Sequence, residues 1–375
     1  MDTVPTASIV INNYNYERFV RFAIDSALAQ SHADSEVVVV DDGSSDGSRA
    51  VIDAYRDQVH AVYKPNGGQA SAFNAGFEVS RGDIVCFLDA DDVLEPTAIE
   101  AAGAALAAHG TTQVQWPLWH LDADGGRSGA LYQGGALPEG DIAEEVLRTG
   151  PISHGFSPTS GNAFARAFLE RVLPMPEQDF RLFADTYLAA LAPLYGRLAR
   201  IDEPQACYRQ HGAGAHVGAS FEAMVHELLG VIERVWDVAI EHAVALGLEP
   251  DRTRWPEHSW WHRLARLLDD VSPLIGSSDD FVLIDDDMLG LTWRCGRAHP
   301  FLERDGMYWG PPPDDATAVA ELRRMRDAGA RYVVVVWPSF WWLDHYADLR
   351  TELYAAGPPL LDDERVKVFV LGPQG

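Results

Sequence analysis

The first 110 residues alternate short apolar runs with segments of helical periodicity. Residues 37–40 are four consecutive valines and residues 84–88 read IVCFL, so neither run offers a polar face to solvent. Such runs are typical of strands buried on both faces of a sheet. Ahead of them, apolar residues recur at helical spacing and predict a helix that packs on the sheet: Phe19, Phe22, Ala23 and Ala27. The alternation predicts an open α/β sheet with right-handed crossovers.

Polar segments follow the predicted strands or the turns after them. They read NNYN at residues 12–15, DDGSSDG at 41–47, NGGQ at 66–69 and DADD at 89–92. Because ligands of open α/β sheets bind at the carboxyl ends of the strands, we expect these four segments to converge on one crevice.

The pattern changes after residue 110. Residues 111–220 read as an α+β half that packs on the first, with a hairpin whose tip is Asp122–Gly126. Residues 221–277 carry apolar residues at helical spacing and predict a helical linker. Residues 278–375 predict a small C-terminal α/β domain, built around FVLIDDD, RYVVVVWP and VKVFVLG.

The charge balance narrows the class of partner. The chain has 29 basic and 56 acidic residues, a net charge of -27, and no basic cluster, which excludes nucleic acid as the expected partner. No apolar run approaches the roughly 18 residues of a membrane span, and the polar N-terminus lacks a signal-peptide pattern, so we expect a cytoplasmic protein without a transmembrane segment. The three separated cysteines, Cys86, Cys207 and Cys295, predict reduced thiols rather than disulfides or a zinc site.

Three carboxylates, Asp89, Asp91 and Asp92, follow one buried strand within four positions. Residues two apart on extended chain point the same way, so Asp89 and Asp91 can face one ion together. A divalent cation with oxygen ligands would make this cluster compatible with a phosphate-bearing ligand. A D-x-D tripeptide by itself is more typical of a solvated turn. We predict a hairpin tip at 122–124 and a strand-end turn at 285–287.

The motifs in their order and spacing resemble those of family-2 glycosyltransferases with the GT-A fold. The resemblance rests on SIVINNYNYERFVRFAIDSALAQS, EVVVVDDGSSDGS and KPNGGQASAFNAGFEVSRGDIVCFLDADD, and it is strong over residues 7–110 and weak over 150–215. It implies a Rossmann-like nucleotide-sugar domain with a mixed central sheet, in which residues 1–110 form the nucleotide-binding half and 111–220 the acceptor-binding half.

The resemblance also implies an activity. The family uses a divalent metal, Mg²⁺ or Mn²⁺, to transfer a sugar from a nucleoside diphosphate sugar to an acceptor hydroxyl, with inversion at the anomeric carbon. The implied acceptor is a carbohydrate or glycolipid, and the implied setting is polysaccharide or glycoconjugate biosynthesis, with peripheral association at the inner membrane face.

Residue roles carry over by position. The resemblance places Tyr14 on the nucleotide base, Asp89 at the ribose and Asp91 on the metal. Many relatives have Arg where this chain has Phe73, which leaves Lys64 as the substitute cation for the diphosphate. The full set of nucleotide-sugar contacts implied is Asn13, Tyr14, Asp42, Lys64, Gly68, Gln69, Asn74, Asp89 and Ala90.

Two further residues complete the implied site. Asp185, in RLFADTYLAAL, matches the acidic residue that acts as the base, and desolvation by its apolar neighbours would raise its pKa and favour proton uptake. His211, in CYRQHG, matches a stretch near the diphosphate and is a candidate metal ligand or phosphate contact. The structural alternatives are a helix N-terminal carboxylate at Asp185 and an ordinary core histidine at His211.

The sequence also leaves two other functions open. Residues 43–47, GSSDG, match the G-x-S-x-G turn of serine hydrolases, although only one strand precedes them and Asp41 and Asp42 would disfavour an alkoxide at Ser45. The other rival is a non-catalytic sugar-binding or scaffold protein that keeps the fold.

Overall fold

The computed structural model describes residues 5–132, 137–211, 221–289, 296–304 and 307–371. The chain forms two compact units. The first comprises Met1–Val217 with Val231–Ser259, and the second comprises Gly218–Gly230 with Trp260–Gly375. Each unit has its own sheets and its own core.

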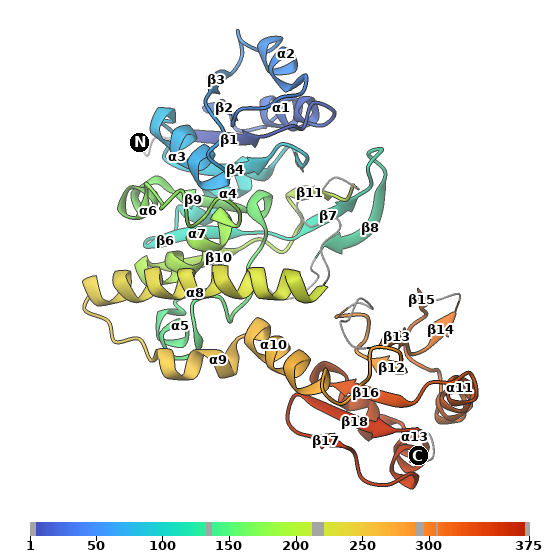
Figure 1. Cartoon of the computed structure of the whole chain (residues 1–375). Helices are drawn as coiled ribbons and strands as arrows, with labels where there is room; N and C mark the ends of the chain where they lie inside the picture. Colours follow the sequence, from blue (N-terminus) through green and yellow to red (C-terminus); the bar gives the residue numbers. More distant parts are fainter. Residues whose placement is uncertain (1–4, 133–136, 212–220, 290–295, 305–306, 372–375) are drawn as a thin grey trace. The chain divides into compact units, whose positions relative to one another are not determined.

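The first unit is built on a seven-stranded mixed sheet, in the order β10-β6-β9-β4-β1-β2-β3 (Figure 1). The four strands β4, β1, β2 and β3 run parallel, whereas β9 is antiparallel to both of its neighbours. This arrangement confirms the expected mixed sheet. The strands are β1 (Ala7–Asn13), β2 (Ser35–Asp41), β3 (His60–Tyr63), β4 (Ile84–Asp89), β6 (Thr111–Gln115), β9 (Asn162–Ala165) and β10 (Arg197–Arg200).

Helices cover both faces of this sheet, and successive strand residues enter different cores. Ile9 and Ile11 of β1 pack with α1 (Val20–Leu28), α2 (Ser48–Asp53) and α4 (Ala98–Leu106). Val10 packs with α3 (Gln69–Val79), α5 (Ala143–Thr149), α6 (Arg166–Val172) and α7 (Ala184–Tyr195) on the other face. The apolar runs are therefore buried on both sides, as predicted.

One residue of the predicted apolar stripe does not face the core. Phe19, Ala23 and Ala27 are buried, but Phe22 is 44% exposed. The guanidinium of Arg209, a buried residue, lies 5.5 Å from the centre of the Phe22 ring, so this exposed ring packs against a cation. The prediction for Phe22 was wrong because periodicity alone does not distinguish the edge of an apolar stripe from its centre.

Helix α3 approaches strand β1 closely at Gly76. A Cβ atom at this position would lie 2.2 Å from Cγ1 of Val10 and 3.2 Å from Cγ2 of Val40. Only glycine permits this separation of helix and sheet. The contact fixes α3 at a short distance from the sheet, and Gln69 begins the same helix seven positions earlier.

A second sheet of the first unit has the order β5-β11-β7-β8. The predicted hairpin is confirmed as the antiparallel pair β7 and β8, and its tip is held by Oδ1 of Asp122, which accepts from the backbone N–H groups of Asp124 (2.9 Å) and Gly126 (2.7 Å). The strands are β5 (Val93–Leu94), β7 (Leu118–Leu121), β8 (Arg127–Tyr132) and β11 (Ala206–Arg209).

The segment expected to be a helical linker is shared between the units. It contains α8 (Phe221–Ala245), α9 (Trp255–His258) and α10 (Trp260–Val271). Val231, Val235 and Ala239 of α8 belong to the core of the first unit, whereas Val225 belongs to that of the second. One helix therefore contributes to two cores.

The second unit is a three-layer α/β structure around a five-stranded sheet, in the order β13-β12-β16-β18-β17. Strands β13, β12 and β16 are parallel, and β18 is antiparallel to both of its neighbours. Helix α10 covers one face, and α11 (Asp315–Asp327), α12 (Trp341–His345) and α13 (Ala347–Ala355) cover the other. The strands are β12 (Asp280–Ile284), β13 (Arg297–Pro300), β16 (Tyr332–Val336), β17 (Leu361–Asp362) and β18 (Val366–Val370), with a hairpin of β14 (Glu303–Arg304) and β15 (Met307–Tyr308).

This unit confirms the predicted C-terminal α/β region and the predicted turn at 285–287, which directly follows β12.

Cys86 and Cys207 are free and buried, and burial raises the pKa of the two thiols to about 12 and about 11. Cys295 lies outside the described residues. Within the described ranges, every helix is too short or too polar to cross a membrane.

Candidate functional site

The carboxyl ends of β1, β2 and β4 bring the polar segments together, as predicted. The strand register pairs Asn12 with Asp89 and Asn13 with Asp41. Both pairs are joined by side chains, since Nδ2 of Asn12 donates to Asp89 (2.8 Å) and Nδ2 of Asn13 donates to Asp41 (3.0 Å). Adjacent strands thus hold both acidic segments at one sheet edge.

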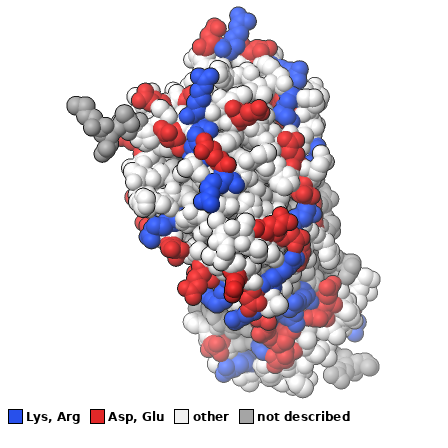
Figure 2. Space-filling model, turned by 90° about the vertical axis from the view of Figure 1, so that its left-hand side faces the viewer, with Lys and Arg blue, Asp and Glu red and all other residues white. Residues whose placement is uncertain are grey.

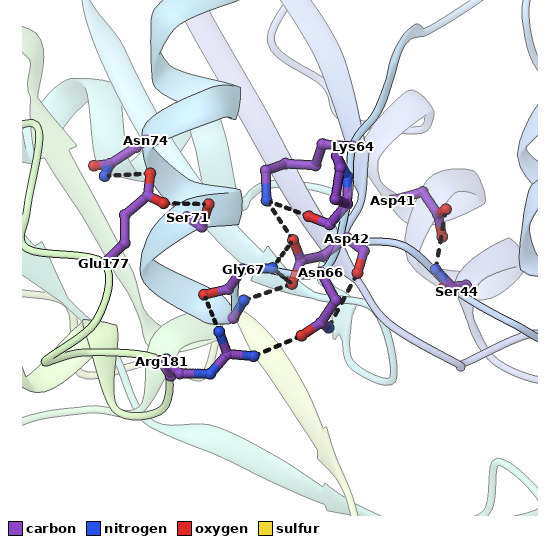
Figure 3. Close-up of polar contacts among 12 residues, drawn as sticks. Asp41, Asp42, Ser44, Lys64, Asn66, Gly67, Ser71, Asn74, Glu177 and Arg181 are labelled. Atoms are coloured by element: carbon purple, nitrogen blue, oxygen red, sulfur yellow. Dashed lines mark hydrogen bonds and ion pairs between the residues drawn. The ribbon is translucent and has the colours of Figure 1, made fainter.

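Asp42 is buried and holds the glycine-rich loop. Its carboxylate accepts from Nζ of Lys64 (2.6 Å) and from the backbone N–H groups of Gly67 (3.0 Å) and Gly68 (2.7 Å), as Figure 3 shows. The structure therefore places Lys64 in an ion pair with Asp42. Asp42 and Lys64, which we expect to contact the nucleotide, also organise the loop that joins β3 to α3.

Arg181 brings a second cation to this loop, and the sequence reasoning missed it. Its guanidinium donates to the carbonyl of Gly67 (3.2 Å) and to Oδ1 of Asn66 (2.6 Å) (Figure 3). Its own carbonyl accepts from the N–H of Gln69. The side chain is exposed to solvent. The available signal was its position four residues before Asp185, in the segment that leads into α7.

The predicted metal ligands Asp91 and His211 lie side by side. Nε2 of His211 is 2.9 Å from Oδ2 of Asp91, and both side chains are largely buried. Arg209 fixes this contact, because its N–H donates to Asp92 (2.9 Å) and its Nε donates to the carbonyl of Asp91 (2.8 Å). The end of β11 is thereby docked on the acidic segment.

The acidic segment carries more negative charge than its neighbours neutralise. Burial and then the charge of Asp91 raise the pKa of Asp89 to about 7. Burial, followed by the charges of Asp91 and Asp89, also raises the pKa of Asp92 well above its usual range. Tyr16 has a raised pKa for the same reasons, burial first and the neighbouring carboxylates second. A bound cation would relieve this repulsion.

The donor atoms here fit a hard divalent ion. Asp89 and Asp91 offer carboxylate oxygens, which Mg²⁺ and Mn²⁺ prefer, and His211 offers an imidazole nitrogen. Within the described part of the chain, however, no three acidic, histidine or cysteine side chains are grouped closely enough to hold an ion by themselves. A metal at Asp91 and His211 would therefore take further ligands from a bound substrate.

Gln69 links the acidic segment to the start of α7. Its Nε2 donates to Oγ1 of Thr159 (3.2 Å) and to Asp89 (3.4 Å), and its Oε1 accepts from the N–H of Ala184 (3.0 Å). Asp185, the next residue, contributes to the raised pKa of Asp89 through its charge. The predicted base therefore lies at the same cluster as Asp89.

The environment of Asp185 matches the sequence expectation. Burial raises the pKa of its carboxyl group, although hydrogen bonds from Thr186 and Thr159 oppose the shift. Its Oδ1 accepts from the N–H of Thr186 (2.8 Å) at the first turn of α7. The carboxylate is thus both a helix N-terminal group and a candidate proton acceptor.

The remaining predicted contacts differ in accessibility. Tyr14 is 47% exposed, so its ring is available to a ligand, whereas Asn13 and Ala90 are buried. Nδ2 of Asn74 donates to the carbonyl of Met175 (2.9 Å), and Oδ1 of Asn74 accepts from the N–H of Met175 (2.9 Å). These bonds join α3 to the segment before α7.

The turn at 43–47 is occupied by contacts with the first loop. The Ser45 hydroxyl donates to Oδ1 of Asn15 (3.3 Å), which also accepts from the Ser45 N–H (2.7 Å). This arrangement gives Ser45 a role in joining two loops rather than the environment of a nucleophile.

The surface charge is mixed on the face that Figure 2 shows. Basic side chains there are interspersed with acidic ones and form no continuous basic patch.

Comparisons with known proteins identify the family of the chain. The sequence profile described as "Glycosyl transferase family 2" matches residues 8–154. An uncharacterized glycosyltransferase of Nostoc sp. is 39% identical over 221 residues, which are 57% of this chain and 67% of that protein. Hyaluronan synthase of Pasteurella multocida is 41% identical over 103 residues, which are 27% of this chain and 11% of the synthase.

The solved structures are less similar to this chain in sequence than these relatives are. S. aureus TarS (residues 1-349, in complex with UDP) has a TM-score of 0.47 and 20% identity, with 72% of each chain covered. The mannosyltransferase of Pyrobaculum calidifontis, in complex with GDP-Man and Mn²⁺, has a TM-score of 0.46 and 17% identity, with 72% of this chain and 76% of that chain covered. From the sequence matches and the motifs that they contain, the chain belongs to glycosyl transferase family 2 and is a glycosyltransferase.

Proposed function

We propose that the protein transfers a sugar from a nucleoside diphosphate sugar to a hydroxyl of a carbohydrate or glycolipid acceptor, with Mg²⁺ or Mn²⁺ and with inversion at the anomeric carbon. The observation that carries the proposal is the contact between Asp91 and His211 inside a cluster of crowded carboxylates. Polysaccharide or glycoconjugate assembly at the inner membrane face is the setting that we infer for it.

The donor would lie across the carboxyl ends of β1, β2 and β4. The exposed ring of Tyr14 would stack on the base, and Asp89 would accept from the ribose. Because Lys64 is paired with Asp42, the cation left for the diphosphate or the sugar is the exposed guanidinium of Arg181 beside Gly67.

Asp91 and His211 would hold the metal. When bound, the ion acts as a Lewis acid that neutralises the leaving diphosphate and fixes its orientation. The protein's own contribution is to hold the two ligands together, through the bonds of Arg209 to the main chain of Asp91 and to the carboxylate of Asp92.

Asp185 would act as the base. Its raised pKa favours uptake of the proton from the acceptor hydroxyl while that oxygen attacks the anomeric carbon. The attack and the departure of the nucleoside diphosphate occur in one displacement, which inverts the configuration. Such a base contributes on the order of 10²–10⁴ in rate.

A screen tests the proposal. The unfolding temperature of the chain is measured with Mn²⁺ and with UDP, GDP, dTDP or CDP sugars. The nucleotide sugar that raises this temperature is then assayed for release of the nucleotide, with and without acceptor sugars. We expect metal-dependent release that Asp91→Ala abolishes. Binding with neither hydrolysis nor transfer would instead favour a non-catalytic sugar-binding protein. Labelling of Ser45 by a fluorophosphonate probe would favour a hydrolase.

A further inference from the structure

The second unit has its own candidate crevice at a sheet edge. The chain passes from β12 to β13 on one side and then, through α11, to β16 on the other side of β12. This reversal between the neighbouring parallel strands β12 and β16 is a topological switch point, where open α/β sheets bind ligands beyond the carboxyl ends of the strands. Figure 1 shows these strands side by side. The residues at that point are 285–288 and 337–342.

Asp286 organises this edge. Its Oδ1 accepts from the hydroxyl of Tyr308 (3.1 Å) and Nε1 of Trp342 (3.0 Å), and its Oδ2 accepts from the hydroxyl of Ser339 (2.9 Å) and Nε1 of Trp341 (3.0 Å). The donors come from β15, from the 3-10 turn Trp337–Ser339 that follows β16, and from α12. Asp286 also has a φ of 52°, a conformation uncommon outside glycine. One carboxylate thus positions two indole rings.

The two indoles have different exposures. Trp342 is fully buried in the core beneath the sheet edge, whereas Trp341 is 42% exposed. Trp341 also packs against Trp342 and His345, with ring centroids 5.8 Å apart in both cases. An aromatic ring that is held by a hydrogen bond and by ring contacts loses little further freedom when it binds a ligand.

Two other exposed apolar side chains belong to the segments that Asp286 joins to α12. Met288, two residues after Asp286, is 52% exposed, and Trp309, which follows Tyr308, is 62% exposed. Single exposed apolar residues need no explanation, but Trp341, Met288 and Trp309 all lie on segments that the Asp286 carboxylate joins, which suggests binding.

The polar groups of the edge indicate the class of ligand. The carboxylates of Asp287 and Asp344 are exposed, the second 4.0 Å from Arg350, and they favour a neutral ligand over a phosphate-bearing one. Arg304 lies 4.8 Å above the Trp309 ring and offers hydrogen-bond donors. Apolar ring faces together with exposed acceptors and donors suit a neutral sugar, which has apolar C–H faces and hydroxyl groups that both donate and accept.

We propose that the carboxyl edge of the second unit's sheet binds a neutral hexose oligosaccharide, with Trp341 stacked on one sugar ring. This site is separate from the donor site of the first unit. The proposal depends on the family assignment only in making a glycan a relevant ligand, and not on the metal or the base.

The test uses the whole chain and three probes: cellohexaose, maltohexaose and chitohexaose. Binding is measured by saturation-transfer NMR and by titration of the tryptophan fluorescence. We expect at least one probe to bind, Trp341→Ala to weaken that binding by about tenfold or more, and Trp341→Phe to weaken it less, because phenylalanine keeps a ring. Tyr354→Ala is the matched control, since Tyr354 is 41% exposed on α13 of the same unit and packs on Phe369.

The variants distinguish oligosaccharide binding at this site from sugar transfer at the site of the first unit. Asp91→Ala should bind the probe as the unaltered chain does, even though it lacks transfer. If Trp341→Ala lowers the unfolding temperature, Trp309→Ala takes its place, because Trp309 is the more exposed ring. Failure of all three probes to bind, or equal effects of the Trp341→Ala and Tyr354→Ala substitutions, would overturn the proposal.

Discussion

The imidazole of His211 contacts the carboxylate of Asp91 at 2.9 Å, although 120 positions separate the two residues. The contact depends on strand pairing, because Cys207 of β11 is paired with Val93, two residues after Asp91. The DADD segment and the CYRQHG segment are therefore parts of one structure, and each positions a group for the other.

Removing either member of this pair should weaken metal binding. We expect Asp91→Ala and His211→Ala each to lower the affinity for Mn²⁺ in the presence of nucleotide by about tenfold or more, as measured by isothermal titration. His258→Ala, at an exposed histidine of the same unit, is the control. An unchanged Mn²⁺ affinity in His211→Ala would assign that histidine a structural role.

Replacing Asp185, the proposed base, should separate binding from transfer. Asp185→Asn should keep the nucleotide affinity and lower kcat by on the order of 10²-fold or more, because the amide cannot take up the acceptor proton. Asp179→Asn, at an exposed carboxylate six residues earlier, should leave both quantities unchanged. Normal turnover by Asp185→Asn would place the base elsewhere.

The raised pKa of Asp89 predicts a pH-dependent stability. The folded pKa of about 7 exceeds the ordinary value of 3.8, so the metal-free folded chain binds a proton more tightly than the unfolded chain does. Ionisation of Asp89 therefore lowers the free energy of unfolding as the pH rises. This loss is absent below about pH 4 and reaches its full size above about pH 7. Asp89→Asn removes this cost and should be more stable than the unaltered chain at about pH 8, by on the order of 1–3 kcal/mol.

Urea unfolding without metal measures this difference. The gain in stability of Asp89→Asn should shrink as the pH falls from about 8 to about 5, and Mn²⁺ should stabilise the unaltered chain at the higher pH. A difference in unfolding free energy that does not vary with pH would show that Asp89 is not the responsible group.

Gln69 should act as a positioning residue. Gln69→Met keeps the length of the side chain but loses the bonds to Ala184, Thr159 and Asp89. We expect kcat to fall by about tenfold to a hundredfold with little change in the donor KM, because the base and the donor site shift relative to each other. Gln58→Met, at an exposed position, is the control. A parallel loss of unfolding temperature and of both kinetic constants would indicate a purely structural role.

Arg181 should contribute to donor affinity. Arg181→Ala should raise the dissociation constant of the nucleoside diphosphate sugar by about tenfold, because a hydrogen bond to a charged group is worth about 1.5–3 kcal/mol. Arg148→Ala removes an exposed cation elsewhere in the first unit and should have no effect. The same dissociation constant in the Arg181 variant would show that the guanidinium serves only to hold the loop.

The parts of the candidate site that lie in short unbroken stretches of sequence could be predicted. The valines of β2 and the segments ending β1 and β4 are local patterns, and their convergence follows from parallel pairing. The bonds of Asp42 to Lys64, Gly67 and Gly68 were not predictable, because they depend on the path of a loop.

Other differences between the prediction and the structure also arise where local sequence patterns give no signal. Phe73 stands where many relatives have a cation, but it is fully buried and stacks on Phe87, with ring centroids 4.1 Å apart. A second cation at the glycine-rich loop, besides Lys64, comes from Arg181, which is distant in sequence. In the second unit, β14, β15 and β17 are two residues long, too short for any periodicity to indicate them.

The close contact of Gly76 with Val10 makes transfer depend on a residue that has no side chain. An added methyl group would push α3 away from β1 and carry Gln69 with it. This shift would separate Asp185, the proposed base, from the proposed donor site although neither had been altered. A screen for inactive variants would therefore recover this interior position together with the acidic residues, and its variants would retain every group that touches the substrate.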